Sequence, residues 1–357
     1  MFSSNIKSFI FFNIYFLIVV DIFLLLGIYF EIIKNKVRTK HYEKAYEKLK
    51  SKILDYIKNE DKILEIQQLL NKDFNKNVAI DIMVNYSQEN DVDISEKFIK
   101  LNLDRFIIDK IREKAKIDYI KKLSFMRVET AYDTLLKLSS SEDLDISYIS
   151  FFGLSMINNE KWKKEIVIKK LIYSNILSDR IIEILNRFQL SFEHWLELLE
   201  KEESTNGKVI FIKTITPKEE MKKVENSDRL LKFLDDQVEV KISTILALCN
   251  SKNDKYVDKL KDIYESEENW QVRVIIAKGF RNFKFDKVKD VLLKMTKDKE
   301  WWVRYNALKS IVAMGEEGVF TLIDLSLEKE DKNISDLAYY FLNSNREVYN
   351  IVKNIEV

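Results

Sequence analysis

The chain has 357 residues, with 59 Lys and Arg against 58 Asp and Glu, so its formal net charge is +1. This balance removes any global argument for binding nucleic acid or another polyanion. Six glycines and one proline are too few for the many turns of a sheet-rich or nucleotide-binding α/β protein. The composition therefore predicts an all-α fold of helices joined by short polar turns.

Residues 9–30 form the first predicted element, with the sequence FIFFNIYFLIVVDIFLLLGIYF. As a helix this stretch spans roughly 33 Å, enough for a hydrocarbon core of about 30 Å. A cleaved signal peptide would have a shorter apolar region followed by small residues at the cut. We therefore expect a single-pass transmembrane helix over residues 9–33, preceded by a short extracytoplasmic tail (1–8).

The charges that flank this segment predict its orientation. Lys7 precedes it, whereas five cations follow it closely: Lys34, Lys36, Arg38, Lys40 and Lys44. Positive charge accumulates on the cytoplasmic side of membrane helices. The expected location is therefore the cell membrane, with the C-terminal domain in the cytoplasm. The single cysteine, Cys249, is compatible with a reducing compartment.

Asp21 is the unusual residue of the predicted span. An ionised carboxylate near the middle of a membrane helix costs roughly 2.5–3.5 kcal/mol on insertion scales. Asn13, eight residues earlier, lies about 80° away around the helix, so the two polar groups share one face. Either both contact a partner helix in a membrane complex, or Asp21 is protonated in lipid.

The remainder of the chain is expected to be helical throughout. Residues 34–59 form a charged amphipathic stalk helix, since Tyr42, Tyr46, Leu49 and Ile53 fall on one face. Residues 60–226 show apolar positions at helical spacing between polar turns, which predicts degenerate helical repeats. Residues 227–357 show clearer repeats with a C-terminal cap.

These clearer repeats have a period of 31 or 32 residues. Val272-Arg273 recurs 31 residues later as Val303-Arg304, and Val240-Lys241 stands 32 residues earlier. Each unit then holds two antiparallel helices of about twelve residues. Stacked helix pairs of this length form an α-solenoid with a continuous core.

The turn residues resemble those of the HEAT-repeat family, in its short bacterial variant, and the anchor makes the chain similar to membrane-anchored members. An acid in the turn precedes Val-Arg and then a small residue, as in Asp298, Val303-Arg304 and Ala307. The resemblance implies a ladder of acids and cations between successive turns. Its expected members are Asp235, Lys241, Glu267, Arg273, Asp298 and Arg304. Ser335 stands at the cation position in the last unit.

The sequence offers few groups for catalysis or metal binding. His41, His194 and Cys249 are far apart and are the only residues of their types. This excludes a His/Cys metal site of usual spacing and makes a Cys–His nucleophile pair a poor hypothesis. No glycine-rich phosphate-binding motif occurs. We expect no catalytic residue, cofactor, metal or small-molecule substrate.

Three tryptophans, Trp270, Trp301 and Trp302, lie at equivalent turns of the repeats. They either pack the turns or anchor a protein partner on the ridge of the solenoid. Lys278 and Lys309, 31 residues apart, either form a basic stripe on the face of the second helices or belong to a solvated face.

These patterns favour a non-enzymatic, membrane-tethered scaffold or adaptor that holds a protein partner. The resemblance implies that this partner is membrane-associated, with an envelope or exopolysaccharide glycosyltransferase as one candidate. The alternative is a regulatory or sensory subunit of a membrane complex. A HEAT-like nucleic-acid-binding protein or lyase-type enzyme fits the neutral charge and the anchor less well.

Overall fold

The computed structural model describes residues 2–59, 62–113, 117–157, 160–328 and 331–344, with side chains from Val20 onward. Every regular element in these ranges is a helix, so the predicted all-α class is confirmed for this part of the chain. The chain divides into two units, Met1–Val167 and Ile168–Val357, and each is described by itself.

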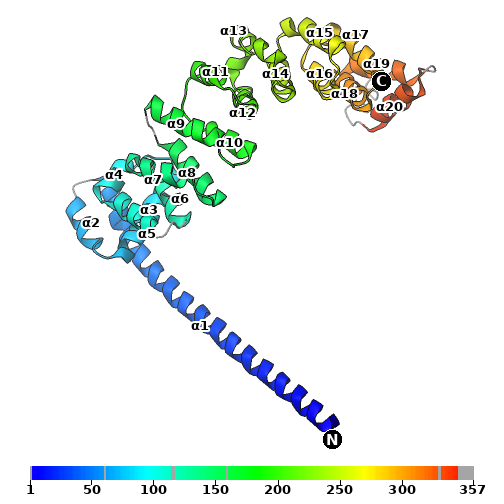
Figure 1. Cartoon of the computed structure of the whole chain (residues 1–357). Coiled ribbons are helices and arrows are strands. Elements are labelled where there is room, and N and C mark those ends of the chain that lie inside the picture. Colours follow the sequence, from blue (N-terminus) through cyan, green and yellow to red (C-terminus); the bar gives the residue numbers. More distant parts are fainter. Residues whose placement is uncertain (1, 60–61, 114–116, 158–159, 329–330, 345–357) are drawn as a thin grey trace, which may run out of the picture. The chain divides into compact units, whose positions relative to one another are not determined.

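The first unit begins with α1 (Phe2–Lys58), an unbroken helix of 57 residues. Its C-terminal part packs against α3 and buries one face that includes Ile53 and Tyr56. From residue 20 to residue 40 every side chain is exposed. The segments predicted as a membrane span and a stalk are therefore parts of one continuous helix (Figure 1).

Among the residues that the structure describes, no helix is long and apolar enough to cross a membrane. The predicted span, residues 9–33, begins within residues 2–19, whose side chains lie outside the described part. Asn13 lies there as well. The span and the contact expected of Asn13 therefore stay predictions.

The rest of the first unit is a bundle of short helices around α3 and α6, which contact each other. Its elements are α2 (Ile63–Leu69), α3 (Asp73–Asn90), α4 (Ser95–Lys100), α5 (Leu103–Glu113), α6 (Ile117–Phe125), η2 (Glu129–Ala131), α7 (Tyr132–Leu138) and α8 (Leu144–Met156). The helix α9 (Lys161–Ile172) contains the boundary with the second unit.

Two helices of this bundle, α6 and α8, approach each other closely at Gly153. A Cβ atom at this position would lie 2.2 Å from the Ser124 hydroxyl oxygen. That buried hydroxyl donates to the Ile120 carbonyl at 2.8 Å and to the Ile149 carbonyl at 3.3 Å. The contact therefore needs glycine on one helix and a satisfied polar group on the other.

The second unit is a run of helix pairs. Its elements are α10 (Ser178–Leu185), α11 (Phe192–Lys201), α12 (Thr205–Ile215), η3 (Glu219–Lys222), α13 (Val224–Asp228), η4 (Leu231–Asp235), α14 (Val238–Asn250), η5 (Asp254–Tyr256), α15 (Val257–Ser266), α16 (Trp270–Gly279), η6 (Phe280–Asn282), α17 (Phe285–Met295), α18 (Trp301–Val312), α19 (Glu316–Ser326) and α20 (Lys332–Ser344).

The second helices of successive pairs form a row, in which α12, α14, α16, α18 and α20 each pack against the next. Their first residues are separated by 33, 32, 31 and 31 positions. Between α16 and α18 the core contains Ile276 and Ala307, both fully buried. The buried Ser310 hydroxyl also donates to the Ala277 carbonyl at 2.7 Å. The predicted α-solenoid is thus present in the second unit, with pairs that begin at α11 and α12.

Close packing in this row generates the first prediction, at the contact between α14 and α16. A Cβ atom on Gly279 would lie 2.3 Å from the Sγ atom of Cys249, which is buried. We expect Gly279→Ala to lower the free energy of unfolding by about 1–3 kcal/mol through overpacking. Urea unfolding followed by circular dichroism measures this loss, with Lys278→Ala on the exposed face as the control.

A double variant tests the same contact. Cys249→Ala removes the Sγ atom, so the combination with Gly279→Ala should lose less stability than the two single changes together. Strictly additive losses would mean that the two side chains do not compete for the same space.

Candidate protein-binding surface

The turns that precede the second helices hold the most constrained side chains of the second unit. In two successive turns an acid accepts a hydrogen bond from the backbone N–H two residues later. Glu267 accepts from Asn269 at 2.9 Å, and Asp298 accepts from Glu300 at 2.8 Å. Each carboxylate is therefore held at the start of its helix, where partial positive charge favours it.

A cation from the preceding repeat reaches each of these acids. The Arg273 Nε and Nη2 atoms donate to the two carboxylate oxygens of Asp298 at 2.9 and 3.0 Å. Lys241 donates to Glu267 at 3.0 Å. The acid of each turn thus accepts hydrogen bonds from a backbone N–H of the same turn and from a cation of the preceding repeat. The bond to the cation links neighbouring repeats.

One expected member of this ladder is corrected by the structure. Lys208 of α12 lies 2.6 Å from Asp236, which also accepts from the backbone N–H of Gln237. Asp235 is exposed at the end of η4. The six-residue spacing to Lys241 had pointed to Asp235. The tight helical turn η4 ends at Asp235, and the next residue, Asp236, occupies the position that Glu267 and Asp298 occupy in the later turns.

Arginine serves a second purpose in these turns, because its guanidinium also satisfies backbone carbonyl groups. The Arg273 Nη1 atom donates to the carbonyls of Glu267 and Glu268 at 3.1 and 2.8 Å. Arg304 donates in the same way to the carbonyls of Asp298 and Lys299, at 2.8 and 3.1 Å. Lysine, a single ammonium, lacks this fork of donors.

The Arg273–Asp298 pair is the most buried of these links. Their side chains are only 5% and 6% exposed. Burial opposes ionisation of the Asp298 carboxyl, but the Arg273 guanidinium, the backbone N–H of Glu300 and the Tyr264 hydroxyl together outweigh it and lower the pKa of Asp298 below its usual value. The pKa of Arg273 is raised, chiefly by its hydrogen bonds to Asp298.

Beside this ladder lies an exposed aromatic cluster, which we call the aromatic surface: Trp301, Trp302, Tyr305 and Tyr340. The Trp301 ring meets Trp302 edge-on at 4.6 Å and stacks on Tyr305 at 5.1 Å. Trp301 and Trp302 are 44% and 52% exposed, and Tyr340 is 55% exposed. Tyr305 contacts the buried Phe341 of α20 at 5.1 Å, so the cluster joins two repeats.

A small open cavity of about 260 Å³ adjoins the aromatic surface. Its lining residues come from α18 and α20: Trp301, Arg304, Asn333, Asp336, Leu337 and Tyr340. Apolar walls stand beside one cation and one anion. The size and the mixed lining suit the insertion of a side chain from another protein.

The structure places the sequence-predicted partner residues along the same row of helices. Trp270 begins α16 and is 41% exposed, one repeat before Trp301. Lys278 and Lys309 are exposed at equivalent positions of α16 and α18. The equivalent residue of α20 is Tyr340, 31 positions after Lys309. Sequence reasoning missed Tyr305 and Tyr340, although four-residue spacing from Trp301 and the repeat period could have indicated them.

The remaining predicted sites are separate from this surface. Asp21 is exposed on α1 in the first unit. Within the part of the chain that the structure describes, no group of three or more His, Cys, Asp or Glu side chains could hold a metal ion.

Paired helices stacked in register define an α-solenoid, a class of protein that generally serves as a scaffold for other proteins. Residues 257–340 match the model of a family described as HEAT repeats. A search of curated proteins finds no match. Among solved structures, the crystal structure of an engineered protein is similar at 13% identity and a TM-score of 0.34, covering 87% of this chain and 95% of the other.

The buried ladder pair generates the second prediction. Arg273→Met leaves the Asp298 carboxylate buried without its cation, which should lower the free energy of unfolding by about 3–5 kcal/mol at neutral pH. Lys294→Met is the matched control, since Lys294 pairs with Glu265 at the surface, where ion pairs contribute about 0–1 kcal/mol. Urea unfolding measures both variants.

The pH dependence of this loss has a defined sign. Because the folded pKa of Asp298 is lowered, its stabilisation is complete above the unfolded value of about 3.9 and is lost as the pH falls through the folded pKa. The difference between Arg273→Met and the unaltered protein should therefore shrink as the pH falls below about 4. A constant difference from neutral to acid pH would contradict the ion-pair explanation.

Proposed function

We propose that this protein is a non-enzymatic adaptor that tethers a protein partner to a membrane. Residues 9–33 anchor the chain, and the C-terminal HEAT repeats bind the partner at the aromatic surface. The observation that carries the proposal is the exposure of Trp301, Trp302 and Tyr340, together with the cavity that Trp301 and Tyr340 line beside Arg304. Tryptophan, tyrosine and arginine are the residues most enriched at the energetic centres of protein interfaces.

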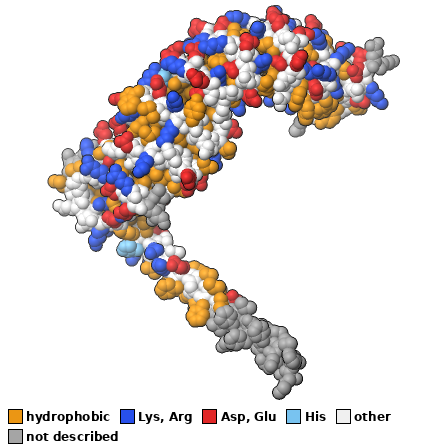
Figure 2. All heavy atoms as spheres, viewed as in Figure 1, with side chains coloured by type: hydrophobic (Ala, Val, Ile, Leu, Met, Phe, Trp, Pro, Cys, Tyr) orange, Lys and Arg blue, Asp and Glu red, His pale blue; other side chains and the backbone are white. Residues whose placement is uncertain are grey.

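The exposed apolar part of α1 supports the membrane anchor. Three consecutive residues, Leu24, Leu25 and Leu26, are 60%, 64% and 57% exposed, although they point in directions about 100° apart. An amphipathic helix has one apolar stripe, whereas a helix that is apolar all round requires a buried or lipid environment. Figure 2 shows hydrophobic side chains along the described part of this helix. The cations after Ile33 favour a cytoplasmic location for the two units.

The lone thiol supports a non-enzymatic role. Cys249 is 1% exposed, and its burial raises the pKa of the thiol to about 12. It is therefore protonated and inaccessible at neutral pH, which is unsuitable for a nucleophile.

The adaptor hypothesis predicts that the aromatic surface holds the partner. Trp302→Ala and Tyr340→Ala should each weaken the complex about 30-fold, the effect of losing roughly 2 kcal/mol at an interface centre. The measurement is recovery of the partner with the full chain from detergent-solubilised membranes, followed by a titration with the purified partner. A membrane-bound envelope or exopolysaccharide glycosyltransferase is the first candidate to examine.

The chain offers a matched control in Trp162 of α9, which is 55% exposed and lies in the other unit. Trp162→Ala should leave the complex unchanged. Equal recovery of the partner with Trp302→Ala and with Trp162→Ala would exclude the aromatic surface as the binding site.

A second function, regulation within a membrane complex, is favoured by the way α1 is fixed to its unit. The Tyr42 hydroxyl donates to Asp81 of α3 at 2.5 Å. Lys122 of α6 bridges Asp81 and Asp118, each at 2.7 Å. Burial and the bond to Asp81 raise the pKa of Tyr42, so this donor stays protonated. A shift of the continuous helix would therefore be passed directly to α3 and α6.

Asp21 distinguishes a regulatory helix from a simple tether. If it contacts a partner helix, Asp21→Leu should leave membrane insertion intact and weaken the complex about threefold to thirtyfold, the range for polar contacts between membrane helices. Ile22→Leu, on the adjacent face, is the control. Co-purification of the partner measures the effect, and an unchanged complex would assign α1 to tethering alone.

A further inference from the structure

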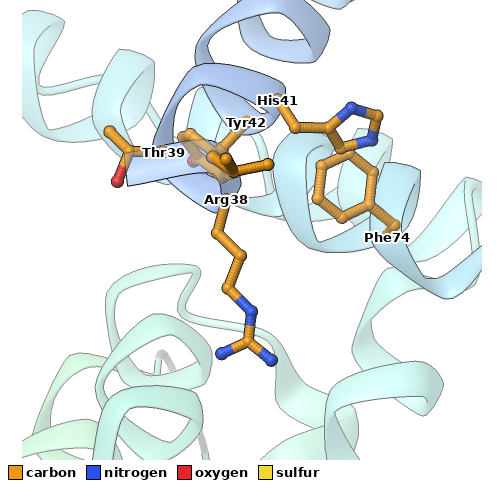
Figure 3. Close-up of a pocket in the computed structure, with 6 residues that line it drawn as sticks. Arg38, Thr39, His41, Tyr42 and Phe74 are labelled. Atoms are coloured by element: carbon orange, nitrogen blue, oxygen red, sulfur yellow. The ribbon is translucent and has the colours of Figure 1, made fainter. Parts of the chain in front are cut away.

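A second open cavity, of about 670 Å³, lies in the first unit where α1 meets the beginning of α3. Its lining residues are Val37, Arg38, Thr39, His41, Tyr42 and Phe74. The His41 and Phe74 rings lie 4.8 Å apart and form one wall (Figure 3). The Arg38 side chain extends away from these two rings (Figure 3). The cavity therefore combines an apolar wall with a cation at its edge.

If residues 9–33 span the membrane as proposed, the residues of α1 that line this cavity lie at the membrane surface. Val37 follows Ile33 by four residues, or roughly 6 Å along the helix. The layer of lipid headgroups on each side of the hydrocarbon core is about 5–7 Å thick. Val37 is 64% exposed and Phe74 is 37% exposed. Val37 would then lie within the headgroup layer, and Phe74 lines the same cavity.

Charge around the cavity is strongly positive. Lys36, Arg38 and Lys40 are exposed on α1, and none of them forms an ion pair with a described residue. Nearby acids are mostly engaged, because Glu31 pairs with Lys34 at 3.0 Å and Asp73 pairs with Lys110 at 3.3 Å. A cluster of cations directly after a membrane helix attracts anionic lipid headgroups.

We propose that this cavity binds an anionic phospholipid of the membrane that holds α1. The phosphate and its acidic headgroup lie on Arg38 and the neighbouring lysines, while the glycerol backbone contacts Val37 and Phe74. The inference deepens the proposed membrane anchor and rests on it. The lipid would hold the first unit at a defined distance from the membrane.

The experiment uses the full chain in lipid nanodiscs and a single fluorescent label. Because Cys249 is buried, a thiol dye will react selectively with an introduced cysteine. The labelled variants are Ile28→Cys in the anchor, Val37→Cys in the cavity and Leu64→Cys as a control on α2. Quenching by nitroxide-labelled phospholipids reports which position contacts lipid, in discs of phosphatidylcholine with and without phosphatidylglycerol.

We expect quenching at position 28 in both kinds of disc, quenching at position 37 that increases with phosphatidylglycerol, and none at position 64. Arg38→Glu should lower the apparent affinity for phosphatidylglycerol at position 37 by fivefold or more, given about fivefold for each cation near a charged membrane surface. Lys48→Glu, farther along the same helix, should have little effect because salt screens charges beyond about 10 Å.

A second pair of variants tests the apolar wall. Phe74→Ser should reduce quenching at position 37, whereas Leu64→Ser, at a more exposed apolar residue of the same unit, should not.

The quenching results distinguish a failure of the lipid site from a failure of the membrane anchor. Quenching at position 28 without quenching at 37 would retain the anchor and overturn the lipid site. Quenching at position 37 that is equal in discs with and without phosphatidylglycerol would exclude an anionic headgroup. Quenching at 37 that disappears when the partner is added would identify a protein segment as the occupant. No quenching at position 28 would overturn the anchor itself, and the lipid site with it.

Discussion

The buried pairing of an acid in one turn with a cation from the preceding repeat is the constraint on which the second unit depends. A buried carboxylate is costly unless every oxygen has a partner. Asp298 meets this condition with two bonds from Arg273 and one from its own backbone. The two bonds from Arg273 join neighbouring repeats and constrain how one is placed against the next. The ladder thus defines the register in which the second helices stack, while the apolar core supplies most of the stabilisation.

That register also produces the aromatic surface. Once α18 and α20 are held in place, Tyr305 meets Phe341 and Tyr340 lines the same cavity as Trp301. Trp301, Trp302 and Tyr340 keep 44–55% of their area exposed, so much of their surface is available for contact with another molecule. Stability and the proposed recognition therefore use different faces of the same helices. The separation allows residues of the surface to vary without loss of the solenoid, as Tyr340 stands where Lys309 and Lys278 stand in earlier repeats.

In the first unit, one helix has a buried part and an exposed apolar part. Its C-terminal part contributes Ile53 and Tyr56 to a protein core, whereas its exposed apolar part has no protein neighbour among the described residues. The Tyr42–Asp81–Lys122 network marks the transition between these environments. The cavity at Phe74 opens at the same level. Under the proposed function, a helix that is continuous with a folded unit would transmit its position far better than one attached through a flexible linker.

The sequence by itself determined the helical class and the repeat period, because apolar spacing and the recurring Val-Arg pair reflect local helix geometry and inter-repeat packing alike. It also placed Arg273, Asp298 and the exposed tryptophans at turns. Only the tertiary structure decided that Asp236 and not Asp235 meets Lys208, because the tight turn of η4 alters the register at that junction. The same holds for the meeting of Tyr305 with Phe341 and for the cavity between α1 and Phe74. Such contacts join residues tens of positions apart, and their geometry depends on how one helix pair rotates against the next, which periodicity does not encode.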